Sequence, residues 1–253
     1  MKNLLLIFSL LIIGIIQAQQ KDLYLLIGQS NMAGRGDFKT KIDSTDISSV
    51  FLLNDKGVFE NAKNPLNRYS TIRKVCEPEL LGVGLGASFS KEVSLFLKDS
   101  VYLIVNARGG TSIDKFLKGG DDAYYETILN RTINALDKNK DLRLKAILWH
   151  QGESDSKNTD EYLKKLGMMV SDFRTDFKMP LLPFIAGELG RWNRNYDQIM
   201  KKIQMIPNYI DNSYLVSSKG LKNKDKHHFN TNSYKKLGKR YAEVCKKVIC
   251  QVK

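Results

Sequence analysis

Short apolar runs alternate with longer amphipathic segments along most of this chain, and this alternation constrains the fold more than any other feature. The apolar runs have the length of buried strands and lie at residues 23–27, 50–53, 101–105, 146–149, 182–186 and 214–216. Segments with helical spacing of apolar residues lie at 87–97, 123–136, 161–173, 196–206 and 232–248. Strands that alternate with helices of this length are typical of βαβ units. The sequence therefore predicts an α/β fold, a three-layer α/β/α sandwich with a mostly parallel central sheet.

The first eighteen residues differ in character from the rest of the chain. Lys2 precedes a nearly continuous apolar run at 4–16, and Ala18 supplies a small residue after it. This pattern is typical of a secretory signal peptide, and the run is shorter than the roughly 20 apolar residues of a membrane span. We predict a signal peptide at 1–18, a single domain at 19–253 and a secreted or periplasmic protein. A retained N-terminal anchor is the alternative; after cleavage we expect no stable membrane insertion.

The net charge of +13 comes from lysines that are scattered along the chain. No arginine-rich stripe with interleaved aromatic residues accompanies them, so we predict no nucleic-acid partner. A solvated lysine-rich surface explains the charge, and a preference for an anionic polysaccharide is the alternative. Charge and composition give no prediction of oligomeric state.

Three cysteines, Cys76, Cys245 and Cys250, leave the disulfide pattern open. Cys245 and Cys250 lie close in sequence, but Cys76 is an alternative partner for either of them. No Cys-x-x-Cys pair indicates a zinc or redox site.

Polar segments follow four of the predicted strands, directly or after a loop. They are 28–31, 106–112, 150–155 and 225–230. The carboxyl ends of parallel strands meet at one edge of the sheet, where α/β proteins keep their ligand sites. We therefore expect these four segments to lie together.

Ser30 in the first of these segments is a candidate nucleophile. A serine hydroxyl needs a base to remove its proton, and histidine suits this role near neutral pH. His228 is the favoured base, because Asp225, three residues earlier, fits on the same turn and would orient its ring. His227 is the alternative base, with a poorer spacing from Asp225.

Ester hydrolysis also requires N–H groups that stabilise a negative oxygen, each worth roughly 3–4 kcal/mol of the barrier. Candidate donors are the backbone of Ser30 and the backbones of Gly109 and Gly110, because glycine permits close approach. The side-chain amide of Gln151 is a further candidate. A metal site built from Asp225, His227, His228 and His150 is a weaker alternative, since its spacing is unlike that of closed zinc sites. We predict no metal and no cofactor.

The four segments resemble the SGNH hydrolases, and specifically their carbohydrate-esterase branch, which includes sialate O-acetylesterase-like proteins and acetylxylan esterases. The matching blocks are Gly-Gln-Ser-Asn-Met at 28–32, Ala-x-Gly-Gly-Thr at 107–111, Trp-x-Gln-Gly-Glu-x-Asp at 149–155 and Asp-x-x-His-Phe at 225–229. The blocks occur in the family's order and span nearly all of the chain after residue 18.

This resemblance implies a flavodoxin-like SGNH fold, with Ser30 as nucleophile, His228 as base and Asp225 as its orienting group. It implies an oxyanion hole formed by Ser30, Gly109, Gly110 and Gln151. Supporting positions are Gln29, Asn31 and Glu153.

The expected function is removal of O-acetyl groups from carbohydrate through an acetyl-enzyme. The expected substrate is acetylxylan or an acetylated sialic acid or glycan. The alternatives are a lipid, aryl or general short-chain esterase with the same triad, and a glycan-binding relative without catalysis. Five side chains are candidates for a sugar-binding cleft, with surface or core packing as the alternative: Arg108, Arg191, Trp192, Tyr124 and Tyr125.

Overall fold

Seven strands form one sheet in the computed structural model, which describes residues 20–73 and 81–251. The strands are β1 (Lys21–Gly28), β2 (Val50–Leu53), β3 (Phe59–Asn61), β4 (Val101–Ala107), β5 (Leu142–His150), β6 (Phe184–Gly187) and β7 (Ser213–Val216). Their order across the sheet is β3-β2-β4-β1-β5-β6-β7. All pairs are parallel except the β2–β3 pair at one edge. The predicted α/β class with a mostly parallel sheet is confirmed.

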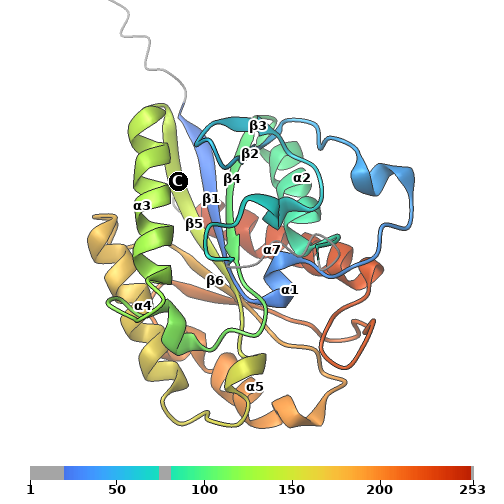
Figure 1. Cartoon of the computed structure of the whole chain (residues 1–253), viewed down its shortest axis with the longest axis vertical. Helices are drawn as coiled ribbons and strands as arrows, with labels where there is room; N and C mark the ends of the chain where they lie inside the picture. The colour runs from blue at the N-terminus through green and yellow to red at the C-terminus, as the bar shows by residue number, and fades with distance from the viewer. Residues whose placement is uncertain (1–19, 74–80, 252–253) are drawn as a thin grey trace, which may run out of the picture.

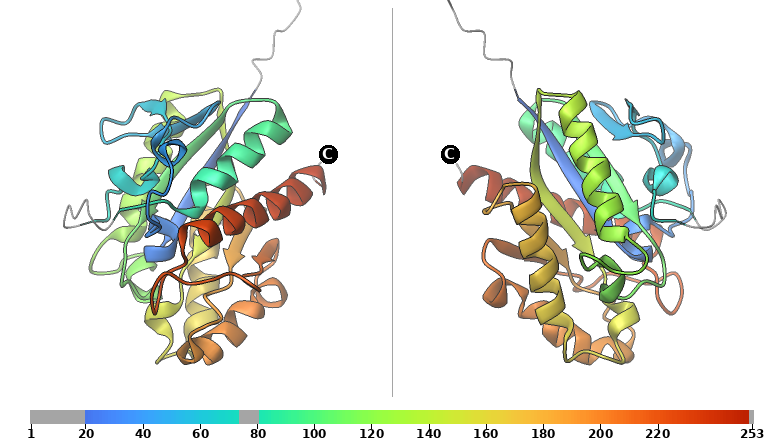
Figure 2. Two further views of the ribbon diagram at one scale, coloured as in Figure 1. Left: turned by 90° about the vertical axis from the view of Figure 1, so that its right-hand side faces the viewer. Right: turned by 60° about the vertical axis from the view of Figure 1, so that its left-hand side comes forward.

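Helices cover both faces of the sheet (Figures 1 and 2). The α-helices are α1 (Ser30–Ala33), α2 (Leu85–Leu97), α3 (Tyr124–Lys138), α4 (Tyr162–Asp176), α5 (Asp197–Gln204), α6 (Ile206–Tyr209) and α7 (Thr231–Gln251). Short 3-10 turns are η1 (Lys41–Ser44), η2 (Leu66–Tyr69), η4 (Ile113–Phe116), η5 (Glu153–Asp155) and η6 (Arg194–Tyr196). In Figure 1, α3 and α4 lie on one side of the sheet, and α2 and α7 lie on the other.

The central strand β1 shows why the molecule has three layers. Leu23, Leu25 and Ile27 pack into the core under α3 and α4, whereas the alternate residues Tyr24 and Leu26 pack into the core under α2 and α7. A strand with both faces buried reads as a continuous apolar run, as β1 does.

Some elements differ from the sequence prediction. The expected helix at 196–206 is divided into η6, α5 and α6, and Pro207 lies in the first turn of α6, where its missing N–H costs no hydrogen bond. The short edge strand β3 was not predicted, because its three residues are too few to show an alternating pattern. The strand β5 begins earlier than expected, at Leu142, because Leu142 and Leu144 are buried while Arg143 between them is exposed.

The predicted signal peptide at 1–18 and the residue Cys76 lie outside the described residues. Within the described ranges, no helix combines the length and the apolar composition that a bilayer span requires. Cys245 is buried and Cys250 is exposed, and both are free thiols, so these two cysteines do not pair with each other.

The register of the central strands determines where the site forms. Gly28 at the end of β1 is paired with Ala107 of β4 and with His150 of β5. The three segments that follow these strands therefore start at the same level of the sheet. This is the edge at which open α/β sheets bind ligands.

Candidate active site

Ser30 lies at the first position of α1, immediately beyond the end of β1. The turn requires glycine at position 28, where φ is +142° and a Cβ atom would lie only 2.3 Å from the carbonyl oxygen of His150. The N–H of Gln29 donates to that same oxygen at 3.0 Å. The result is a tight turn that brings Ser30 to the carboxyl edge of the sheet, with 7% of its surface exposed.

His228 joins Ser30 and Asp225 in one hydrogen-bonded chain. Its Nε2 atom lies 3.1 Å from Oγ of Ser30, and its Nδ1 atom lies 2.8 Å from Oδ2 of Asp225. The other carboxylate oxygen, Oδ1, accepts from the backbone N–H groups of His227 at 2.8 Å and His228 at 2.9 Å. An ionised Asp225 accepts a hydrogen bond from an Nδ1–H group of His228. This tautomer leaves Nε2 unprotonated and facing the hydroxyl group of Ser30.

The charge state of Asp225 follows from these contacts. Partial burial raises the pKa of Asp225, but the hydrogen bonds from His227 and His228 outweigh burial and bring this pKa below its ordinary value. Asp225 is therefore ionised near neutral pH, which suits a group that stabilises a histidine cation.

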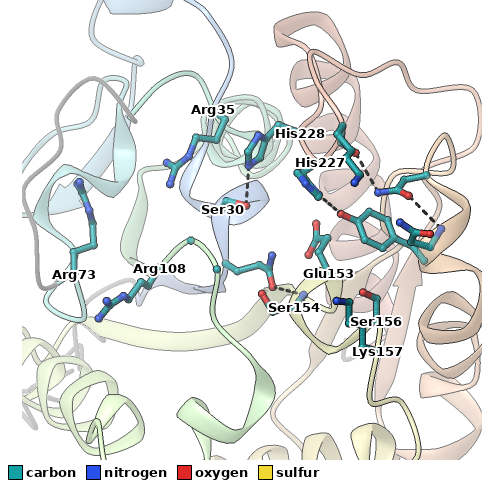
Figure 3. A pocket seen from close by; sticks show the side chains of 17 residues that line it. Ser30, Arg35, Arg73, Arg108, Glu153, Ser154, Ser156, Lys157, His227 and His228 are labelled. Carbon is teal, nitrogen blue, oxygen red and sulfur yellow. Dashed lines mark hydrogen bonds between the residues drawn. The ribbon is translucent and has the colours of Figure 1, made fainter.

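His227, the alternative base, points to a different partner. Its Nδ1 atom lies 2.5 Å from the hydroxyl group of Tyr196, which comes from η6. Figure 3 shows His227 beside His228, but only His228 is joined to Ser30 by a hydrogen bond. The geometry therefore favours His228 as the base.

Asn31 connects the segment of the nucleophile to the segment of the base. Its Nδ2 atom donates to the carbonyl oxygen of His227 at 3.0 Å and to Oε1 of Glu153 at 2.5 Å. Its Oδ1 atom accepts from the backbone N–H of Phe229 at 3.4 Å and from the hydroxyl group of Tyr234 at 2.6 Å. Because residues 227 and 229 flank His228, these bonds fix the base relative to the residue next to Ser30.

Glu153 lies beneath the triad, with 9% of its surface exposed. Burial raises its pKa to about 7, and the hydrogen bond from Asn31 only partly opposes this effect. Its Oε2 atom has no hydrogen-bond partner among the described residues. Glu153 therefore changes protonation near neutral pH at the floor of the site.

The candidate oxyanion donors are backbone N–H groups on two neighbouring turns. Gly109 lies close to the nucleophile, because a Cβ atom at this position would be 3.5 Å from Cβ of Ser30. Gly110 has a φ of +67°, the left-handed region that favours glycine. Within the described ranges, the N–H groups of Ser30, Gly109 and Gly110 donate to no other backbone carbonyl, so they are available to a ligand.

The structure places Gln151 elsewhere. Its side chain is fully buried and donates to the carbonyl oxygen of Thr111 at 2.9 Å and to the carboxylate of Asp155. Asp155 in turn accepts from the N–H of Ile113 with both oxygens, at 3.1 and 3.2 Å. Gln151 is absent from the described residues that line the pocket, whereas Gln29 is among them. Gln151 and Asp155 thus hold the segment that follows Gly110.

A pocket of about 930 Å³ opens above Ser30 (Figure 3). Most of the residues that line it are polar or charged types, and five of them are basic: Arg35, Arg73, Arg108, Lys157 and Lys226. The four predicted segments include Arg108 and Lys226, but the sequence prediction missed Arg35, Arg73, Lys157 and Tyr196. Arg35 lies three residues after Met32, the end of the first block, whereas Arg73, Lys157 and Tyr196 lie outside all four blocks.

The remaining candidates for a cleft are divided between the surface and the core. Arg108 lines the pocket, and Tyr124 lines an adjoining cavity. Tyr125 is fully buried and stacks on Phe173. Arg191 forms an ion pair with the buried Glu188.

Trp192 packs against Phe229 and donates to the carbonyl oxygen of Lys226, so it supports the histidine loop. His150 is completely buried, which lowers its pKa to about 3. Its Nδ1 atom is hydrogen-bonded to the hydroxyl group of Tyr241. In the described part of the chain, no cluster of three or more His, Cys, Asp and Glu side chains has the arrangement of a metal site.

The fold and the four segments at its carboxyl edge define a class, the SGNH-type hydrolases. Residues 20–247 match the model of one family in that class, described as carbohydrate esterase, sialic acid-specific acetylesterase. The chain belongs to this carbohydrate-esterase family, and the resemblance drawn from the four sequence blocks is confirmed.

Relatives cover most of the chain. A probable carbohydrate esterase of Arabidopsis thaliana is 29% identical over 242 residues, which are 88% of this chain and 89% of the relative. An X-ray structure of an Arabidopsis thaliana protein is 28% identical, with a TM-score of 0.78 and coverage of 90% of this chain and 98% of that chain.

Two more distant structures share the fold. The crystal structure of NanS is 17% identical, with a TM-score of 0.70 and coverage of 94% and 100% of the two chains. A carbohydrate acetylesterase from Xanthomonas citri is also 17% identical, with a TM-score of 0.65. The match covers 90% of this chain and 56% of the Xanthomonas citri chain.

Proposed function

We propose that this protein is an exported serine esterase that removes O-acetyl groups from carbohydrate through an acetyl-enzyme. The observation that carries the proposal is the hydrogen-bonded chain from Ser30 through His228 to Asp225. Membership in the carbohydrate-esterase family supports an ester of a sugar as the substrate. Export rests on the predicted signal peptide at 1–18.

In the first half of the reaction, Oγ of Ser30 attacks the acetyl carbonyl carbon while Nε2 of His228 takes its proton. The carbonyl oxygen becomes negative, and the free N–H groups of Ser30, Gly109 and Gly110 are the donors available to it. The protonated His228 then gives the proton to the sugar oxygen as the C–O bond breaks. The sugar leaves as an alcohol, and the acetyl group stays on Ser30.

In the second half, water attacks the acetyl carbon with His228 again as base. Collapse of the intermediate returns the proton to Ser30 and releases acetate. In both halves the ionised Asp225 stabilises the histidine cation and fixes its ring. Gln151 does not contact the acetyl group in this scheme. Its side chain donates to the carbonyl oxygen of Thr111 and so holds the turn that carries the N–H groups of Gly109 and Gly110.

The pocket lining favours a sugar ester over a lipid ester. Tyr196 and the imidazole rings of His227 and His228 are its aromatic side chains among the described residues, and the rest of the wall is glycine, serine, amide and charged residues. Long acyl chains bind in apolar grooves, because their transfer from water stabilises a complex only where apolar surface is buried. Sugar hydroxyl groups need the donors and acceptors that this wall presents. Acetylxylan and acetylated sialic acids or glycans remain the proposed substrates.

The covalent intermediate can be tested directly. The protein is treated with diethyl p-nitrophenyl phosphate, an organophosphate that phosphorylates activated serines, and the modified peptide is identified by mass spectrometry. We expect loss of activity together with modification of Ser30, and no modification in the His228→Gln variant under the same conditions. Modification of a different residue with loss of activity would contradict the assignment of the nucleophile.

A further inference from the structure

A second cavity adjoins the active-site pocket. It has a volume of about 350 Å³, and it shares four lining residues with the pocket: Arg108, Gly109, Gly110 and Ser154. Figure 3 labels Arg108 and Ser154 among the side chains that line the active-site pocket. The volume falls within the range of small-molecule sites, roughly 300–1,000 Å³.

The two cavities meet over a floor that has no side chains. Gly109 and Gly110 form this floor, and a Cβ atom placed on Gly110 would have no other atom within 4 Å. The space above Gly110 is therefore open. A ligand that reaches Ser30 in the first cavity can extend over Gly110 into the second cavity. On this path it passes beside Arg35, because the guanidinium Nη2 of Arg35 would lie 2.9 Å from a Cβ atom on Gly109.

The far wall of the second cavity carries paired polar groups. Lys115 of η4 forms an ion pair with Asp122, and the guanidinium of Arg108 donates to the hydroxyl group of Tyr124. Ser112 adds a hydroxyl group. A cation beside a carboxylate offers a hydrogen-bond donor and an acceptor side by side. Each hydroxyl group of a sugar both donates and accepts, so such a pair can bind neighbouring sugar hydroxyl groups.

Buried contacts hold this wall in place without a ligand. Both carboxylate oxygens of Asp155 accept from the N–H of Ile113, the first residue of η4. The ring of Tyr124 packs edge-on against Phe116 of the same turn. A wall that is ordered before binding loses little conformational entropy when a ligand arrives.

We propose that this second cavity is a subsite for the sugar next to the acetylated one, so that the substrate is an acetylated oligosaccharide or polysaccharide chain and not a free monosaccharide. This inference rests on the proposed function, because it extends the same site. The acetylated sugar occupies the larger cavity, and its neighbour binds between Arg108 and the Lys115–Asp122 pair.

The test compares three substrates: p-nitrophenyl acetate, xylose with one O-acetyl group, and xylobiose with an O-acetyl group on one of its two sugars, so that the other sugar keeps its free hydroxyl groups. For the wild-type protein we expect kcat/KM to be about tenfold or more higher on the disaccharide than on the monosaccharide. For the double variant Lys115→Ala/Asp122→Asn we expect this preference to fall to about threefold or less, with activity on p-nitrophenyl acetate unchanged. Lys118→Ala is the matched control, because Lys118 lies two residues after η4 and pairs with Asp176 outside both cavities.

The outcomes separate the two proposals. Equal kcat/KM on the two sugars, or the same preference in the double variant as in the wild type, would overturn the subsite and leave the esterase proposal intact. If acetate is released from p-nitrophenyl acetate but from neither sugar, the carbohydrate assignment fails, and the subsite fails with it.

Discussion

The Nε2 atom of His228 lies 3.1 Å from the Oγ atom of Ser30, although 198 positions separate the two residues in the sequence. Ser30 is placed by the end of β1, and His228 by the loop that leads into α7. The contact exists because a parallel sheet gathers the residues that follow its strands at one edge. The chemistry proposed for this protein depends on this contact, and the predictions below test its parts.

The two adjacent histidines are expected to differ strongly in importance. His228→Gln removes the group that accepts the proton of Ser30, so kcat on p-nitrophenyl acetate should fall by roughly 10³ to 10⁴-fold. His227→Gln removes a hydrogen bond to Tyr196 and a ring contact with His228 but no bond to Ser30, and we expect a loss of less than about tenfold. Steady-state kinetics of both variants checks this difference. A larger loss in His227→Gln than in His228→Gln would identify His227 as the base.

Asp225→Asn should lower kcat without lowering the thermal stability of the protein. The amide cannot stabilise a histidine cation as the carboxylate does, so we expect kcat to fall by on the order of 10³ to 10⁴-fold. Because Asp225 is solvent-exposed, the midpoint of thermal unfolding should change little. Asp37→Asn is a suitable control, since Asp37 forms an ion pair with Lys224 in the same region. Comparable activity losses in both variants would argue against a specific role for Asp225.

Asn31 should act on catalysis through geometry. Asn31→Ala removes the bonds that hold the residues on either side of His228, and a displaced base lowers kcat by roughly 10 to 100-fold with little change in KM. The free energy of unfolding should fall by about 1–3 kcal/mol. Thr132→Val is the comparison, because it removes a buried hydroxyl group within α3. If both variants lose stability but neither loses kcat, Asn31 has a structural role alone.

Glu153 should make stability depend on pH. Burial raises its pKa from 4.5 to about 7, so between these values the folded protein holds a proton that the unfolded chain has released. The contribution of Glu153 to stability is therefore greatest at low pH and decreases as the pH rises through this window. Glu153→Gln lacks this titration. Its free energy of unfolding relative to the wild type should rise by on the order of 1–3 kcal/mol between pH 5 and pH 8.

Chemical denaturation of both proteins across that pH range provides the measurement. Titrating groups remote from Glu153 are common to both proteins and cancel in the difference. Asp155, whose pKa burial raises to about 6, interacts with Glu153, so the same comparison is made in the Asp155→Asn background. A difference that does not vary with pH would show that Glu153 is ionised throughout.

The strands and the convergence of the triad could be predicted from the sequence. Buried parallel strands produce apolar runs such as residues 23–27, and the parallel topology then brings Ser30, Asp225 and His228 to one edge. No contact between these residues has to be known for this inference. The long-range part of the candidate site was thus the more predictable part.

The orientation of Gln151 could not be predicted, for a physical reason. It follows β5, a strand buried on both faces, so the apolar pattern gives no indication of which face a given side chain occupies. The side chain of Gln151 donates to the carbonyl oxygen of Thr111 and to Asp155, neither of which a strand pattern can indicate as its partner. The hydroxyl group of Tyr162 donates only to the backbone carbonyl oxygen of Gln151. Part of the pocket wall was missed for another reason: Tyr196 ends the short turn η6 and Lys157 lies in a turn after η5, where position depends on packing and not on periodicity.

The most direct test of the central proposal is the release of acetate from an acetylated sugar by the wild-type protein and by Ser30→Ala. Fully acetylated xylobiose and 9-O-acetylated sialic acid are the substrates, and free acetate is measured over time. We predict release by the wild type from at least one of them, with kcat lower by roughly 10³-fold or more in Ser30→Ala. Undiminished acetate release by Ser30→Ala would contradict the account.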